Sequence, residues 1–167
     1  MTSTDGSETD VSPSSWKGVD AAWQELGPAA LRLATVLVGP DDAHDITVAA
    51  FLRVLQAPAW ASVGNQRAYL LRAVTNAAHD HRRQTDRRRR RDIAAVLIES
   101  APGHDPFHIE VRQRLAQLSI EQRAVVFFTY WEDMTEAAIA QLLQISTGTV
   151  HRNLARAKAR LRRTLDE

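Results

Sequence analysis

The chain contains no cysteine among its 167 residues. This absence excludes a disulfide framework, a cysteine-ligated zinc or iron–sulfur site, and a thiol nucleophile. Glycine and proline are also sparse, with 7 and 6 residues, so the chain is neither collagen-like nor mainly of low complexity. Long hydrophobic runs are missing as well, since Arg32 interrupts the apolar stretch 29–38. No segment is long enough to span a bilayer, and we expect no membrane insertion.

The N-terminal residues are polar and acidic instead of basic and then apolar, which is unlike a secretory signal. Residues 1–15 contain almost no apolar side chains and are predicted to form a disordered acidic tail. Together with the lack of a spanning segment, these features predict a cytoplasmic protein. The length suits one compact domain or two small ones.

The formal net charge of +1 hides an uneven distribution of charge along the chain. The first 26 residues are acidic, whereas residues 27–100 and 112–167 are both basic. A basic segment favours an anionic partner, and nucleic acid is the commonest anionic partner of proteins.

Apolar residues recur every three or four positions from Trp16 onward, which is the spacing of one helix face. The first expected helix ends at Gly39-Pro40, and the second, capped by Asp41 or Asp42, ends at Ala57-Pro58. A loop over residues 58–66 precedes a third helix, which continues into the arginine-rich run 82–91. The expected buried stripes are Leu26, Ala30, Leu33 and Leu37; Val48, Phe51, Leu52 and Leu55; and Leu70, Val74, Ala77 and His81. In the second basic segment, a further stripe is expected from Ile120, Ala124, Phe127, Phe128 and Trp131.

The composition of residues 101–106 is that of a linker. We therefore predict a helical domain over residues 16–95, a flexible linker over 96–108, and a second helical domain over 109–167. No segment shows the alternation of a β-strand, so the predicted fold class is all-α, with two small helical domains.

The segment from Thr135 to Leu161 has the spacing of a helix-turn-helix. Thr135 is expected to cap a short helix, Gln144 and Ile145 to turn the chain, and Ser146 to cap the second helix. Arginine can bind guanine through two hydrogen bonds, asparagine can do so with adenine, and hydroxyls can hold phosphate. The alternative is an ordinary helical hairpin with a solvated basic face. The residues expected to contact DNA from the second helix are Ser146, Thr147, Thr149, His151, Arg152, Asn153, Arg156 and Lys158.

A second candidate surface lies on the third helix, which bears Tyr69, Arg72, Asn76 and Arg83 and follows a loop that contains Trp60. Aromatic and amide side chains beside a basic surface suit unstacked, single-stranded bases. For Trp60 and Tyr69 taken singly, packing in the core is the favoured interpretation.

Two sets of short stretches, one in each basic segment, together resemble a known family. One set is 42–46, 51–54 and 69–76, followed by Asp80 and by Arg82-Arg83, and the other is 118–125, 135–143, 145–150 and 154–161. The first set resembles region two, and the second resembles region four, of the extracytoplasmic-function (ECF) sigma factors. The resemblance extends from about residue 25 to residue 165, with the two regions in the family's order.

The resemblance implies a promoter-specificity subunit of bacterial RNA polymerase. Region four would read the −35 element as duplex through the helix after Ser146, and region two would melt the −10 element and hold a flipped base near Asn76. Its partners would be core RNA polymerase, promoter DNA in duplex and melted form, and an anti-sigma factor; no catalytic residue, cofactor or metal is expected. The −10 contacts would be Tyr69, Arg72, Asn76, Arg82 and Arg83, and the core polymerase contacts Asp45, Val48, Ala49, Leu52 and Arg53.

The sequence departs from the family pattern at several positions. Val48 and Ala49 are apolar where the family often has glutamine and glutamate, which bears on how the chain docks to core polymerase. Gln144 stands where a glycine is common, and Arg152-Asn153 stands where serine and arginine are usual. We therefore expect a −35 sequence that differs from the generic one.

Three alternative interpretations compete with a sigma factor. One is a sigma-like or helix-turn-helix regulator that binds DNA or an anti-sigma factor without serving polymerase, which the apolar residues at 48 and 49 favour. A second is a response-regulator output domain, but that leaves residues 25–91 unexplained. The third is an enzyme with metal-binding histidine pairs, 79/81 or 104/108, but neither pair has a helical carboxylate set nearby.

Overall fold

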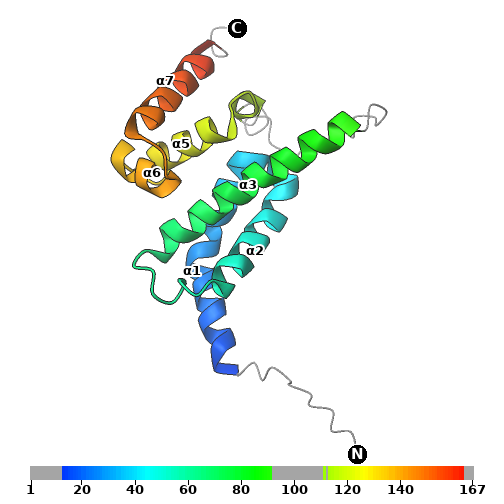
Figure 1. The fold of residues 1–167 in the computed structure, drawn as a ribbon, viewed down its shortest axis with the longest axis vertical. Helices are drawn as coiled ribbons and strands as arrows, with labels where there is room; N and C mark the ends of the chain where they lie inside the picture. The colour runs from blue at the N-terminus through cyan, green and yellow to red at the C-terminus, as the bar shows by residue number, and fades with distance from the viewer. Residues whose placement is uncertain (1–12, 92–110, 112, 164–167) are drawn as a thin grey trace, which may run out of the picture.

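The structure is a computed structural model that describes residues 13–91, 111 and 113–163. Nearly all of these residues are helical. No strand occurs within those ranges, and the all-α prediction is confirmed (Figure 1). The predicted tail over residues 1–15 lies largely outside the described residues, and the predicted linker 96–108 lies entirely outside them. The helices are α1 (Pro13–Val38), α2 (Pro40–Gln56), α3 (Gln66–Arg91), α5 (Ile120–Tyr130), α6 (Glu136–Leu143) and α7 (Thr147–Arg163).

The break between α1 and α2 lies where the sequence predicts it. Gly39 has a φ of 94°, a value that a side chain disfavours, and Pro40 follows at the first position of α2, where its missing N–H costs no hydrogen bond. The prediction that Asp41 or Asp42 caps α2 was wrong, because Gly39 is the N-cap and makes no side-chain capping bond. Both aspartates lie in the first turn, where their charge favours the helix dipole.

The α1, α2 and α3 helices pack together into an N-terminal unit. The predicted stripe of α1 is buried throughout, but the predicted stripe of α2 was wrong at Leu52, which is 52% exposed. Apolar residues occur on two sides of α2, and packing against both α1 and α3 selects one of them. The residues of α2 that this packing buries are Ala43, Ile46, Thr47, Ala50, Phe51 and Val54.

A row of aromatic rings holds the loop between α2 and α3 in place. Trp60 lies 6.5 Å from Phe51 and 6.3 Å from Tyr69, measured between ring centroids, and Phe51 in turn lies 5.0 Å from Trp23. The side-chain amide of Gln66 donates to the carbonyl of Trp60 at 3.1 Å. Both Trp60 and Tyr69 therefore contribute to packing within the N-terminal unit.

The α5, α6 and α7 helices form a C-terminal unit whose caps follow the prediction. The Thr135 hydroxyl accepts a hydrogen bond from the Ala138 N–H at 3.2 Å, and the Ser146 hydroxyl accepts one from the Thr149 N–H at 3.1 Å. Gln144 ends α6 in the left-handed conformation, with a φ of 56°. These local features build the helix-turn-helix that the sequence predicts.

Trp131 differs from its predicted place in the buried stripe of α5. It follows the last residue of that helix and is 56% exposed, with its ring stacked on Phe127 at 6.0 Å. The stripe ends because the helix ends, and sequence periodicity alone does not fix that point.

We expect Thr135→Ala to lower the free energy of unfolding by about 1 kcal/mol, because the first turn of α6 loses its side-chain acceptor. Thr135→Ser keeps the hydroxyl and is expected to remain close to the wild type. Urea denaturation followed by circular dichroism measures both variants. Equal stability of the two variants would show that the cap contributes nothing.

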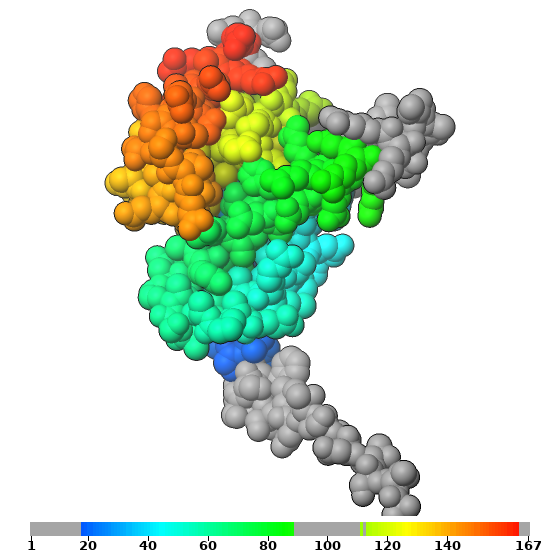
Figure 2. All heavy atoms as spheres, viewed as in Figure 1, coloured from blue at the N-terminus to red at the C-terminus, as the bar shows by residue number. Residues whose placement is uncertain are grey.

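The N-terminal and C-terminal units lie against each other. The α5 helix packs on α1 and α3, and α6 packs on α3, so that the buried residues of both units form one cluster. Figure 2 shows the surface of α3, in green, directly beside the yellow and orange surface of the C-terminal unit. Within the described ranges, no helix combines the length and the apolar character needed to cross a membrane.

Candidate functional site

The first turn of α7 contains a chain of three hydrogen-bonded side chains. The hydroxyls of Ser146 and Thr149 lie 2.8 Å apart, and Arg152 Nη2 donates to Thr149 Oγ1 at 3.2 Å. The same Ser146 oxygen caps the helix. The orientation of the Arg152 guanidinium is therefore coupled to the helix N-terminus.

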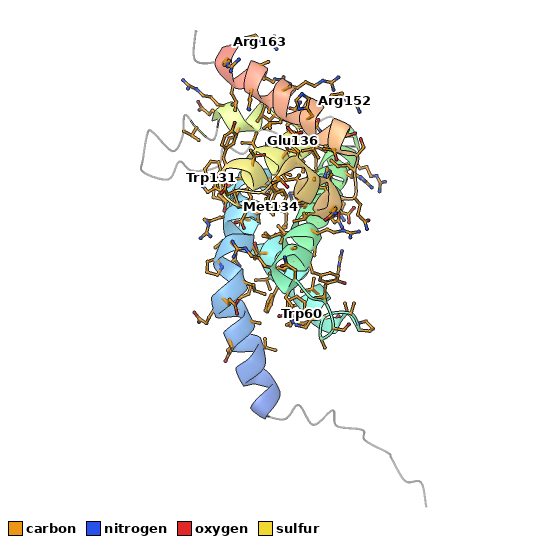
Figure 3. All side chains as sticks on the ribbon, turned by 90° about the vertical axis from the view of Figure 1, so that its left-hand side faces the viewer. Trp60, Trp131, Met134, Glu136, Arg152 and Arg163 are labelled. Carbon is orange, nitrogen blue, oxygen red and sulfur yellow. The ribbon has the colours of Figure 1, made fainter. Side chains whose placement is uncertain are left out.

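A row of arginines follows on the side of α7 that faces away from the core. Arg152, Arg156 and Arg163 are separated by four and seven residues, which places them on one face of a helix. Val150 and Leu154 are buried, and Arg152 lies about 200° around the helix from each of them. Figure 3 shows Arg152 and Arg163 along the outer side of α7, remote from Trp60. This outward basic face is suited to an anionic groove or backbone.

The other α7 residues predicted to contact DNA take different positions. His151 is exposed, and its Nδ1 lies 3.2 Å from Glu136 Oε1 of α6. Lys158 lies over the Tyr130 ring, with Nζ 5.8 Å from the ring centroid. Because six residues separate Lys158 from Arg152, the two side chains leave the helix about 120° apart. Asn153 is half-buried and Thr147 is exposed.

Four of the five predicted −10 contacts share one face of α3. Tyr69, Arg72, Asn76 and Arg83 are separated by three, four and seven residues, the spacing of a helical face. Asn76 and Arg83 are exposed, while Tyr69 and Arg72 are half-buried. Arg82 lies on another side of the helix, where its Nε is 3.8 Å from Asp86.

The residues predicted to contact core polymerase form the outward face of α2. Asp45, Ala49, Leu52 and Arg53 are exposed and Val48 is half-buried. They lie opposite Ala43, Ala50 and Val54, which pack into the unit. An exposed leucine on a face of mixed charge is suited to docking on another protein.

The two histidines of α3 contact carboxylates on different helices. His79 Nδ1 lies 3.5 Å from Glu121 of α5, and His81 Nε2 lies 3.1 Å from Asp42 of α2. The residues that the structure describes contain no group of three or more metal-ligating side chains. His104 and His108 lie outside those residues.

Two pairs of side chains connect α3 to the segments at either end of α6, and neither pair was predicted from the sequence. Arg67 at the start of α3 forms three hydrogen bonds of 2.7–2.9 Å with both oxygens of Glu132. Arg72 donates to Oε1 of Gln144. At Gln144 the sequence offered one signal, a glutamine where a glycine is common in the family. Nothing in the sequence around residue 132 indicates the partner of Glu132.

Arg123 joins the same interface from α5. Its guanidinium donates to the carbonyls of Leu118, Ala116 and Leu37, the last at 2.6 Å. Leu37 lies in the last turn of α1, where carbonyls lack a helical partner. Burial lowers the pKa of Arg123, and the nearby positive charge of Arg82 lowers it further.

Glu121 is held in its charged form beside this contact. Burial acts to raise the pKa of its carboxyl group, but hydrogen bonds from its own N–H and from Ser119, with the charges of His79 and Arg82, outweigh that effect. The net result is a pKa below the ordinary value. The α3–α5 contact thus pairs positive charge on α3 with a stable carboxylate on α5.

Comparison with known proteins finds two family models on this chain. Residues 22–88 match the model of sigma-70 region 2, and residues 108–161 match that of sigma-70 region 4. The first match covers α2 and most of α1 and α3, and the second covers α5, α6 and most of α7.

Curated relatives and a solved structure are similar to this chain along most of their length. An RNA polymerase sigma-E factor of Streptomyces coelicolor is 33% identical over 150 residues, which cover 82% of this chain and 80% of the relative. The sigma-E factor of Streptomyces antibioticus is 29% identical over 144 residues, covering 83% and 79%. The fold is similar to that of the sigma factor RpoE in its co-crystal with the anti-sigma factor NepR from Bartonella quintana, with a TM-score of 0.75, 18% identity, and coverage of 90% of this chain and 98% of that one.

Proposed function

The chain belongs to the sigma-70 family, among the sigma factors of the ECF type, and from this premise we propose that it directs core RNA polymerase to specific promoters. The observation that carries the proposal is the presence of regions 2 and 4, in order, on a single chain. A free-standing helix-turn-helix regulator needs only the second of them, and the first accounts for about the first half of the described residues.

The two regions have different tasks in this proposal. Region 4 reads duplex −35 DNA with the outward face of α7, where Arg152 is hydrogen-bonded and directed away from the core. Region 2 holds the melted −10 strand on the face of α3 that carries Asn76, with the half-buried Tyr69 beside it. The chain supplies recognition and no catalytic group, since phosphoryl transfer belongs to the polymerase, and it acts where that polymerase acts, in the bacterial cytoplasm.

The domain limits and a further partner are part of the same proposal. One domain spans residues 16–95 and the other 109–167, with 96–108 as a linker, which agrees with the gap between the two matched ranges. An anti-sigma factor is the partner expected in the inactive state, because a solved protein of the same fold is held in such a complex.

Co-purification with core RNA polymerase is the first test of this function. The tagged chain is mixed with purified core enzyme, and the recovered complex is assayed for run-off transcription from genomic fragments. Binding together with initiation from discrete start sites supports a sigma factor. Binding to duplex DNA without binding to core enzyme would instead identify a sigma-like regulator.

Leu52→Ala tests the α2 face as the polymerase contact. We expect about a fivefold weaker affinity for core enzyme, because the variant loses about 1 kcal/mol of apolar burial at the interface. Leu52 is 52% exposed, so the fold is expected to tolerate the change. Leu31→Ala, at a leucine of α1 that is 37% exposed, is the matched control and should bind core enzyme normally. Equal affinities of the two variants would remove α2 from the interface.

A further inference from the structure

The strongest unassigned feature of the molecule is the polar contact between its two units. The Glu132 side chain is only 9% exposed and the Arg67 side chain 43% exposed, and the two share hydrogen bonds through both carboxylate oxygens. The second contact, from Arg72 to Gln144, joins α3 to the C-cap of α6. The arrangement with both contacts formed is named the closed state here.

The closed state holds the two DNA-reading helices close together. From Gln144 to Arg152 the chain runs three residues to the start of α7 and five residues along it, which is at most about 11 Å of extended chain and about 8 Å of helix rise. Asn76 lies four residues beyond Arg72 on α3, which is about 6 Å of helix rise. With about 10 Å between packed helices, the two reading residues are separated by about 35 Å at most.

A promoter demands a much larger separation. The −35 and −10 elements are about 25 base pairs apart, which is about 85 Å of duplex at 3.4 Å per base pair. Duplex DNA of this length is stiff, since its persistence length is about 150 base pairs. The closed chain therefore cannot place Arg152 on one element and Asn76 on the other.

The contact from Arg72 to Gln144 also occupies a group that the proposed DNA binding uses. Arg72 lies on the same face of α3 as Asn76 and donates to Gln144 while the chain is closed. Gln144 adopts a left-handed backbone conformation, at φ 56°, that glycine would accept without strain. A glycine at position 144 would therefore relieve the backbone but would lack the side-chain oxygen that accepts the hydrogen bond from Arg72.

We propose that Glu132 and Gln144 form a latch that keeps region 4 against region 2, and that the chain must release this latch to occupy both promoter elements. The requirement for opening at a promoter rests on the proposed function, whereas the latch itself is a property of the free chain. Glu132 attracts Arg67 by charge, so the latch weakens as ionic strength rises. The Glu132 side chain is largely buried, whereas that of Arg67 is 43% exposed, so a substitution at Glu132 changes the more buried partner of the pair.

The distance between the two units in the free chain is the direct readout. The chain has no cysteine, so Gln56→Cys on α2 and Ala137→Cys on α6 introduce two unique sites for spin labels, both at exposed positions. We expect one short, narrow distance for the wild type at low salt. Glu132→Gln and Gln144→Gly should each raise the ratio of open to closed chain at least about fivefold, with unchanged circular dichroism.

Asp133→Asn is the matched control for the charge of Glu132. Asp133 is the adjacent, exposed residue, and its φ of 49° is one that asparagine tolerates. The control should retain the closed distance and its response to salt, whereas Glu132→Gln should respond less to salt. An open fraction in Glu132→Gln equal to that of the control would overturn the latch.

Purified core RNA polymerase then tests the consequence of the latch. Addition of core enzyme to the labelled wild type should replace the short distance by a longer one. A complex that retains the short distance would overturn the requirement for opening. Failure to bind core enzyme at all would refute the proposed function, while the measurements on the free chain would still decide whether the latch exists.

Discussion

Replacing Arg152 by alanine is expected to weaken binding to the chain's own −35 element by about 1–3 kcal/mol, or about 5- to 150-fold. The loss should fall on one base pair, because a guanidinium that reaches a base edge discriminates a single position. Arg152 is exposed, and its guanidinium donates to Thr149, three residues earlier in the chain. The fold is therefore expected to tolerate the change.

Binding to a panel of duplexes with each base pair of the −35 element varied measures this effect. Arg152→Lys keeps the charge but loses the planar group that can donate two parallel hydrogen bonds, so it should retain general affinity for DNA and lose discrimination between bases. Arg162→Ala, at an exposed arginine near the end of α7, is the matched control and should weaken all duplexes alike. A uniform loss with Arg152→Ala would make Arg152 a phosphate contact instead.

Replacing Asn76 by alanine is expected to reduce promoter opening by about 5- to 150-fold while leaving duplex −35 binding unchanged. The amide would supply hydrogen bonds to the edge of a flipped base, and their loss is expected to cost about 1–3 kcal/mol. Asn76 is exposed on α3, so the structure of the N-terminal unit should not depend on it.

Permanganate footprinting of thymines on the bound promoter measures opening, and a mobility shift measures duplex binding. Gln84→Ala removes a second exposed amide from α3, eight residues further along, and should leave opening intact. Equal losses of opening and of duplex binding with Asn76→Ala would refute the assigned role.

Local signals in the sequence were sufficient for much of the fold. The buried stripe of α1, the break at Gly39-Pro40 and the caps at Thr135 and Ser146 all agree with prediction. Each depends on interactions between residues three or four positions apart, or on the backbone limits of glycine and proline. The motifs of regions 2 and 4 were recognisable for the same reason, since they are short and contiguous.

Predictions that required a choice among faces were less successful. Leu52 was assigned to the buried stripe of α2 and is exposed, and Trp131 was assigned to that of α5 and is exposed. In both cases the apolar residues fit a helical period, but neighbouring helices and the end of a helix decide which of them are covered. The roles of individual residues at the candidate DNA and polymerase surfaces stay predictions that the substitutions above are designed to test.

The sequence by itself determined the helices, their caps, the helix-turn-helix and the order of the two regions. Only the tertiary structure decided which face of α2 is outward and how the two units meet. The contacts that join the units connect residues 65, 72 and 86 positions apart, from Arg67 to Glu132, from Arg72 to Gln144 and from Arg123 to Leu37. No periodic pattern encodes such pairs, because their partners are brought together by the packing of whole helices and not by the spacing of residues within one.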